Sequence, residues 1–326
     1  MTDTRHDGRG VATVTGGSSG AAGGTTMAAS PLGAVVDLLR TSPLDLGGDP
    51  DTMRLVFDEM IASHPVPADV RTTAAELGGV PALTVTAGDG EPSGTVLFFH
   101  GGGYALGSAA ASVGLASDIA RRSGTTVHTV DYRLAPENRF PAAVDDALAA
   151  YRGLLEGGVP AETVAVGGES AGGGLALALL VAVREAGLPQ PAAAAVLSPW
   201  VDLTQSGRSH ETKASLDPAL TRQALTIRAD HYLAGADPRS PLASPLFADL
   251  RGLPPLLIQA GTYEVLLDDA LRLAAKAADD DVAVTLQTFP GAPHVFQGFA
   301  AVLAEGARAL DDVAAFLRGH LDGRSR

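Results

Sequence analysis

The chain has 326 residues, of which 46% are hydrophobic, and this length accommodates one large α/β domain or two ordinary ones. Its formal net charge of −14 at pH 7 excludes roles that depend on binding nucleic-acid phosphates or an anionic membrane surface, because both begin with lysine and arginine contacts. The chain contains no cysteine, which excludes disulfides, cysteine-bound metals and thiol nucleophiles.

Residues 1–26 are rich in glycine, serine and threonine. Within them, residues 11–24 imitate the glycine-rich turn that binds pyrophosphate in short-chain dehydrogenases, but no long helix follows this turn. The composition is instead typical of a flexible tail, which leaves residues 27–326 for the folded domain. No apolar stretch follows Arg5 and Arg9, so we expect no secretory signal and a cytoplasmic location.

Short apolar runs of β type alternate with longer alanine- and leucine-rich segments from residue 81 onward. This alternation predicts a doubly wound α/β domain with a mostly parallel sheet. The expected strands are 81–86, 95–99, 126–131, 163–167, 192–197, 255–260 and 282–289. The expected helices are 109–122, 141–152, 171–186, 268–279 and 299–318. The longest strongly apolar run, residues 175–183, is too short for a membrane span, which needs about 20 residues.

Two segments interrupt the alternation of strands and helices. Residues 27–75 carry helical patterns at 31–40 and 51–62, and residues 202–248 carry one at 219–233. Insertions at these places would lie over the carboxyl ends of the strands, where open α/β sheets bind their ligands. We therefore expect the two segments to form a helical cap.

The sequence G-E-S-A-G at residues 168–172 lies between an expected strand and an expected helix. This is the context of a nucleophile elbow, in which a serine on a strained turn projects its hydroxyl away from the sheet. Gly168 and Gly172 remove side chains that would collide with the neighbouring strand and helix. The pattern predicts Ser170 as a catalytic nucleophile.

The sequence H-G-G-G-Y at residues 100–104 directly follows the expected strand 95–99. Consecutive glycines at a strand end allow backbone N–H groups to approach a ligand, as in an oxyanion hole. We expect the N–H groups of Gly102, Gly103 and Ala171 to be its donors. His100 is interpreted as a hydrogen-bonded residue that orients the loop, and not as a proton carrier.

A serine nucleophile needs a base, and on this type of sheet the expected chain order is serine, acid, histidine. Three histidines follow the elbow before the last expected helix ends, and two of them, His210 and His231, fall in the segment 202–248. The third, His294, lies in the turn P-G-A-P-H-V-F between the last strand and the last helix. We therefore predict His294 as the general base.

The acid that orients the base should follow the expected strand 255–260, where the sequence reads G-T-Y-E-V-L-L-D-D. Glu264 is nearest the strand end and is the predicted acid, with Asp268 as the alternative. Asp268 and Asp269 open the next helix, where capping and the helix dipole would account for them.

Two further charged features receive structural interpretations. Glu169 points away from the serine in an elbow, so we expect its carboxylate to hold the strained turn by hydrogen bonds. The sequence D-Y-R-L-A-P-E at residues 131–137 is interpreted as a rigid loop with internal ion pairs.

Together, H-G-G-G-Y, D-Y-R-L-A-P-E, G-E-S-A-G, S-P-W-V-D-L at residues 198–203 and the pairing of Glu264 with His294 resemble the bacterial hormone-sensitive lipase family. The resemblance covers roughly residues 75–318 and implies an α/β-hydrolase fold with a cap and carboxylesterase activity on short to medium acyl esters. The chain departs from the commoner family pattern at Glu169, where aspartate or threonine is usual, and in an acid loop that begins with glutamate. The E-V-L-L-D-D form also looks like that of monoterpene lactone hydrolases and of acetylhydrolases from antibiotic pathways.

The resemblance implies an acyl-enzyme mechanism that needs no metal or organic cofactor. The implied partner is a small-molecule ester substrate. Whether the enzyme forms a homodimer stays open. A lactone or an acetylated metabolite is an alternative substrate, and amide hydrolysis by the same residues is a further one. A non-catalytic small-molecule receptor, like the plant gibberellin receptors, is disfavoured because the serine and the histidine are both present. A serine–lysine mechanism is disfavoured because neither Lys213 nor Lys276 lies three residues after a serine.

Overall fold

The computed structural model describes residues 30–62 and 66–321, so the predicted tail at residues 1–26 lies outside the described residues. The strands are β1 (Val70–Leu77), β2 (Val80–Ala87), β3 (Thr95–Phe99), β4 (Thr126–Val130), β5 (Val164–Glu169), β6 (Ala193–Leu197), β7 (Leu256–Tyr263) and β8 (Val284–Pro293). The α-helices are α1 (Pro31–Arg40), α2 (Pro50–Ala62), α3 (Val113–Ser123), α4 (Ala142–Glu156), α5 (Ala171–Glu185), α6 (Ser209–Thr212), α7 (Arg222–Leu233), α8 (Leu267–Asp279) and α9 (Ala304–Leu321). Short 3-10 helices are η1 (Ala161–Thr163), η2 (Pro245–Phe247) and η3 (Phe296–Phe299).

The strands form one sheet in the order β1-β2-β4-β3-β5-β6-β7-β8. Strands β3 to β8 run parallel to one another, while β2 pairs antiparallel with both β1 and β4. This arrangement confirms the doubly wound, mostly parallel sheet predicted from the alternation of strands and helices. Because the central strands are parallel, the segments that follow β3, β5, β6, β7 and β8 all leave the sheet at the same edge.

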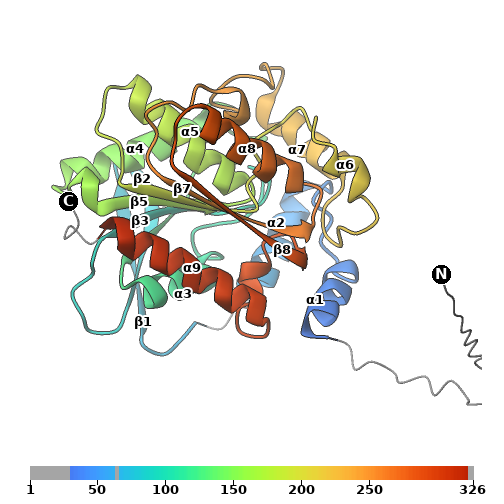
Figure 1. Ribbon diagram of the computed structural model, residues 1–326, viewed down its shortest axis with the longest axis horizontal. Coiled ribbons are helices and arrows are strands. Elements are labelled where there is room, and N and C mark those ends of the chain that lie inside the picture. Colours follow the sequence, from blue (N-terminus) through green and yellow to red (C-terminus); the bar gives the residue numbers. More distant parts are fainter. Residues whose placement is uncertain (1–29, 63–65, 322–326) are drawn as a thin grey trace, which may run out of the picture.

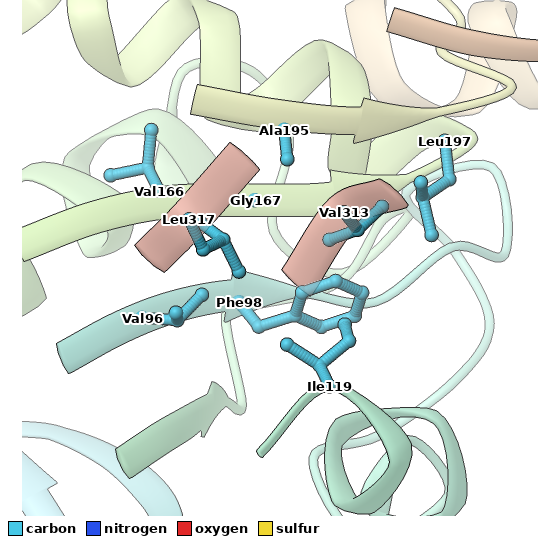
Figure 2. A pocket seen from close by; sticks show the side chains of 9 residues that line it. All are labelled: Val96, Phe98, Ile119, Val166, Gly167, Ala195, Leu197, Val313 and Leu317. Atoms are coloured by element: carbon cyan, nitrogen blue, oxygen red, sulfur yellow. The ribbon is translucent and has the colours of Figure 1, made fainter. Parts of the chain in front are cut away.

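Helices cover both faces of this sheet (Figure 1). Helices α3 and α9 contact each other on one face, whereas α4, α5 and α8 cover the other. Figure 2 shows the apolar packing between the sheet and α3 and α9, where Phe98, Ile119 and Leu317 meet around a void of about 10 Å³. No lining side chain is polar, so this void belongs to the core and lacks the partners that a buried water needs.

The first strand was not predicted, and it shortens the expected cap segment 27–75. Residues 70–77 pair with β2 along its whole length, through a turn at Gly78 and Gly79, whose φ angles are 59° and 85°. Most side chains of β1 are exposed, so the strand has no apolar alternation by which the sequence would indicate it. The last helix also begins later than expected, at Ala304, because η3 and a turn precede it.

Helices α1, α2, α6 and α7 gather on the right of Figure 1, at one end of the molecule. Arg228 on α7 donates to Gly48 O (2.7 Å) between α1 and α2, and so links the two interrupting segments. Tyr232 on α7 stacks on Tyr104, with ring centroids 3.9 Å apart. Helix α7 therefore packs directly on the loop that follows β3. Among residues 30–62 and 66–321, no helix has both the length and the apolar character needed to cross a bilayer.

Candidate active site

Ser170 occupies the single residue between the end of β5 and the start of α5. Its backbone has φ 54° and ψ −122°, a conformation that residues with a side chain rarely adopt and that costs about 1–3 kcal/mol. A Cβ atom on Gly168 would lie 2.3 Å from Gly172 O, and one on Gly172 would lie 2.0 Å from Phe99 O. Both glycines are therefore required for the turn, as the G-x-S-x-G pattern predicts.

The start of α5 surrounds Ser170 with backbone N–H groups. Ser170 is the N-cap residue of α5, yet its side chain makes no capping hydrogen bond, so the helix does not use its hydroxyl. The N–H of Ala171 lies in the first turn, where backbone donors have no acceptor within the helix. The partial positive charge of this helix end favours negative charge that develops beside Ser170.

The glycine loop after β3 passes directly against the serine. A Cβ on Gly101 would lie 3.2 Å from Ser170 Cβ. Gly102 and Gly103 have φ angles of 106° and 63°, and a Cβ on Gly102 would lie 2.3 Å from Leu106 O. Only glycine fits this course of the backbone. The predicted donors Gly102 and Gly103 directly follow Gly101, the residue that lies against Ser170.

The side chains of Glu169 and His100 form hydrogen bonds with the backbone of the glycine loop. The Gly101 N–H donates to Glu169 Oε1 (3.2 Å), which connects the elbow to the loop as expected for this carboxylate. His100 Nδ1 lies 2.7 Å from Gly101 O, and its ring stacks on Tyr132 with centroids 4.3 Å apart. Burial lowers the pKa of His100 to about 4, so the ring is neutral at pH 7 and holds the loop without carrying a charge.

His294 and Glu264 form a hydrogen-bonded pair, with His294 Nδ1 2.7 Å from Glu264 Oε2. The Glu264 side chain is fully buried, and the His294 side chain is 10% exposed. The end of β6 joins this pair to the elbow: Leu197 O accepts from the Ser170 N–H (2.9 Å), and the hydroxyl of Ser198 accepts from the Val295 N–H (3.1 Å). The structure thus brings together the segments that carry the predicted serine, acid and histidine.

Burial and nearby negative charges act in opposite directions on the pKa of His294. Burial lowers the pKa of His294, but the hydrogen bond and charge of Glu264, together with the charges of Asp217 and Glu169, outweigh burial and raise that pKa above its ordinary value. A pair of this kind stabilises an imidazolium and, through the Nδ1 hydrogen bond, leaves Nε2 free to accept a proton.

Asp217 is a residue of this site that sequence reasoning missed. It belongs to the segment 202–248, and its Oδ2 accepts the N–H of Val265, directly after Glu264, at 2.7 Å. Its other oxygen accepts the N–H groups of Ala219 and Leu220. The sequence D-P-A-L at residues 217–220 has the form of a turn in which the aspartate bonds to following N–H groups, and that was the available signal.

We expect the acid limb of the kcat/KM profile to lie above the ordinary histidine pKa, because the predicted general base His294 acts in its neutral form and its pKa is raised. Activity should therefore be lost as pH falls through this raised pKa. The replacement Asp217→Asn removes one of the three negative charges that raise this pKa and should move the limb to lower pH. The measurement is kcat/KM for a p-nitrophenyl ester between pH 5 and 9.

The control for this prediction is Asp89→Asn, which makes the same change in net charge at an exposed residue after β2 that pairs with Arg71. Its acid limb should coincide with that of the unmodified enzyme. An Asp217→Asn limb that also coincides, with folding unchanged by thermal melting, would show that Asp217 does not influence the imidazole.

Asp268 and Asp269 do not have the capping role expected of them. Asp268 Oδ2 accepts the N–H groups of Arg208 and Ser209, and Asp269 Oδ2 accepts those of Val201 and Asp202. Both carboxylates stand in the first turn of α8 but face the segment after β6, because that segment offers free backbone donors. Burial raises the pKa of Asp269 to about 7. Neither carboxylate contacts His294, so the alternative acid Asp268 is not supported by its geometry.

The charged residues of the loop 131–137 form ion pairs with neighbouring helices, and not within the loop as expected. Arg133 pairs with Asp146 on α4 (2.7 Å), and Glu137 pairs with Arg54 on α2 (2.7 Å). Residues 134–138 form a turn in which the Asn138 N–H donates to Leu134 O (2.8 Å), and Arg133 and Glu137 on its two sides bond to different helices. In the part of the chain that the structure describes, no group of three histidine, aspartate or glutamate residues is arranged to hold a metal ion.

A parallel sheet with a serine at the turn after β5, a carboxylate after β7 and a histidine after β8 defines the α/β-hydrolase class. The family model described as alpha/beta hydrolase fold matches residues 96–298. An acetyl-hydrolase of Streptomyces hygroscopicus is 50% identical over 224 residues, which cover 69% of this chain and 75% of that protein. An esterase of Acinetobacter venetianus is 36% identical over 278 residues, covering 84% of this chain and 91% of that protein.

Solved structures agree with these relatives. The crystal structure of an esterase from the bacterial hormone-sensitive lipase family superimposes with a TM-score of 0.86 at 42% identity, covering 89% of this chain and 98% of that one. The chain belongs to the bacterial hormone-sensitive lipase family of α/β hydrolases. It is a carboxylic ester hydrolase, as the resemblance implies.

Proposed function

We propose that the enzyme hydrolyses carboxylic esters through an acyl-enzyme on Ser170, with His294 as general base and Glu264 as the acid that orients it. The observation that carries this proposal is the buried pair of His294 and Glu264, joined through the end of β6 to a serine on a strained strand-to-helix turn. A buried carboxylate on Nδ1 fixes the imidazole tautomer and stabilises the imidazolium that forms during proton transfer.

In this mechanism Ser170 Oγ attacks the ester carbonyl carbon while His294 Nε2 takes the hydroxyl proton. The N–H groups of Gly102, Gly103 and Ala171 donate to the carbonyl oxygen as it becomes an oxyanion, each contributing roughly 3 kcal/mol. The bond to the alcohol oxygen then breaks, and His294 returns the proton to the departing alcohol. Water deprotonated by His294 next attacks the acyl-enzyme, which releases the carboxylic acid and restores the serine hydroxyl.

We assign the cap to helices α1 and α2 in the segment before β1 and to α6 and α7 in the segment 202–248. Arg54 on α2 donates to Ala105 O (2.9 Å) at the end of the glycine loop. On α7, the stem of Arg228 packs on Gly103, where a Cβ would lie 3.0 Å from Arg228 Cγ. Helices in direct contact with the oxyanion loop are placed to shape the entrance for the acyl and alcohol groups of a substrate.

The substrates proposed are small-molecule esters of short to medium acyl chains, acetyl esters among them. The acetyl-hydrolase of Streptomyces hygroscopicus, at 50% identity, favours an acetylated metabolite as the second candidate, to be cleaved by the same residues. Hydrolysis of a lactone differs only in that the alcohol stays attached to the acyl group. Nothing in the described site adds the proton donor that a poor amide leaving group would require.

The proposal is tested by labelling the enzyme with a p-nitrophenyl phosphonate and locating the adduct by mass spectrometry. We expect one adduct per chain, on Ser170, with loss of esterase activity in proportion to labelling. A p-nitrophenyl series from acetate to laurate should show higher kcat/KM for acyl chains of two to six carbons than for twelve. An adduct at another residue, or activity that survives full labelling, would refute the assignment, and absence of both label and turnover would favour a binding protein.

A further inference from the structure

Ser198 is a buried serine with an unusual backbone at the end of β6. It is the first residue of the sequence S-P-W-V-D-L and only 1% of its surface is exposed. Its φ angle of 46° lies in the left-handed region, which side chains other than those of glycine and asparagine seldom adopt. Its N–H donates to Gln259 O (2.6 Å) on β7, so the neighbouring strand holds this conformation.

The hydroxyl of Ser198 has two partners, and both adjoin the acid and base of the proposed mechanism. It donates to Glu264 Oε1 (3.0 Å) and accepts from the N–H of Val295 (3.1 Å), the residue directly after His294. Since Glu264 Oε2 contacts His294 Nδ1 at 2.7 Å, the contacts form a closed ring through Ser198, Glu264, His294 and Val295. The side chain of the residue directly after β6 therefore joins the loop after β7 to the loop after β8.

The Glu264 carboxylate depends on few donors. Its Oε1 also accepts the N–H of Gly261, and its Oε2 faces the imidazole. Each hydrogen bond to a buried carboxylate restricts its orientation, and a hydroxyl donor on a charged acceptor is among the stronger of such bonds. Without Ser198, the carboxylate would keep one backbone donor and could rotate away from the plane of the imidazole.

We propose that Ser198 is a positioning residue that fixes the Glu264 carboxylate and the His294 loop in register with each other. The inference rests on the proposed function, because it gives Ser198 a task only if Glu264 and His294 act as acid and base. The positive φ supports the same conclusion, because a strained backbone persists only where its surroundings hold it, and such residues cluster at functional sites.

The test is a comparison of Ser198→Ala with Ser198→Gly. Both variants lack the hydroxyl, but glycine adopts a positive φ without strain whereas alanine retains the strain. If the hydroxyl positions the pair, both variants should lose kcat by about 10- to 100-fold, the range for a hydrogen bond to a charged group, while KM stays within about twofold. The rate of phosphonate labelling at Ser170 should fall by the same factor, with the final extent of labelling still one per chain.

The matched control is Ser117→Ala, which removes a buried hydroxyl that bonds only to Val113 O within α3. Its kcat should equal that of the unmodified enzyme. Wild-type kcat in both Ser198 variants would overturn the inference, and so would a loss confined to Ser198→Ala, which would show that backbone strain alone matters. Loss of kcat in step with a reduced labelling extent would show misfolding and would likewise count against a positioning role.

These outcomes are separate from failure of the proposed function. If Ser198 variants remain fully active while Ser170→Ala is inactive, only the inference about Ser198 is wrong. If Ser170→Ala keeps its esterase activity, the nucleophile itself is wrong, whatever the Ser198 variants do.

Discussion

Replacing Ser170 by alanine is expected to lower kcat/KM for p-nitrophenyl acetate by at least about 10⁴-fold, because the nucleophile and its proton are removed together. The fold should persist, since the Ser170 side chain makes no capping hydrogen bond to α5 and alanine lacks only the hydroxyl. Initial-rate kinetics measure the loss, and circular dichroism with a thermal melt measures the fold. The protein is best compared at equal concentration with the unmodified enzyme.

Ser123→Ala is the matched control for this prediction, because it removes a buried hydroxyl at the end of α3 that bonds to Ile119 O. Its kcat/KM should remain within about twofold of the unmodified value. If a correctly folded Ser170→Ala protein kept more than about one per cent of the unmodified esterase activity, Ser170 would not be the nucleophile. The strained elbow would then lack its proposed role.

The replacement Glu264→Gln is expected to cost about 10³- to 10⁴-fold in kcat, which is the scale known for the orienting carboxylate of a serine triad. The amide is nearly isosteric but uncharged, so it neither stabilises the imidazolium nor selects the tautomer with a proton on Nδ1. The acid limb of the pH profile should also move to lower pH, because the hydrogen bond and charge of Glu264 are the main contributions that raise the pKa of His294. Steady-state kinetics across pH measure both effects.

Asp268→Asn provides the comparison, because it also converts a carboxylate of the same loop region to an amide. Its oxygen can still accept the N–H groups of Arg208 and Ser209, and it does not contact His294. We expect kcat to change by less than about threefold, with any effect appearing in the melting temperature. The reverse ranking of the two variants would transfer the role of acid to Asp268.

The parts of the site that could be predicted from the sequence are those whose physical requirements are local. Gly168 and Gly172 are needed because their Cβ atoms would meet backbone atoms, and the loop at Gly102 and Gly103 requires positive φ angles. Such requirements are met by residues next to each other in the chain, so they appear as short motifs. The parallel strands could be predicted for a similar reason, because buried parallel strands are continuous apolar runs in the sequence.

The parts that the sequence did not reveal depend on contacts between distant segments. Ser198 meets Glu264 across 66 positions and Val295 across 97, and Asp217 meets Val265 across 48. A serine before proline or an aspartate in a turn is ordinary by itself, and only the packing of β6, β7 and β8 gives it these partners. Strand β1 escaped prediction for a different reason, since its pairing with β2 buries few of its side chains.

The contacts of Arg54 have a consequence for altering which esters the enzyme accepts. Its guanidinium on α2 donates to Ala105 O and Ala135 O and pairs with Glu137, so a single helix spans the glycine loop and the loop after β4. Ala135 N–H in turn donates to Tyr104 O (2.8 Å). Redesigning α2 to admit bulkier molecules would therefore also displace the glycine loop, whose N–H groups at Gly102 and Gly103 we propose as donors to the oxyanion. We therefore expect changes on α2 to alter substrate selectivity and turnover together. Variants that broaden the substrate range should be easier to obtain when Arg54 and its partners are left unchanged.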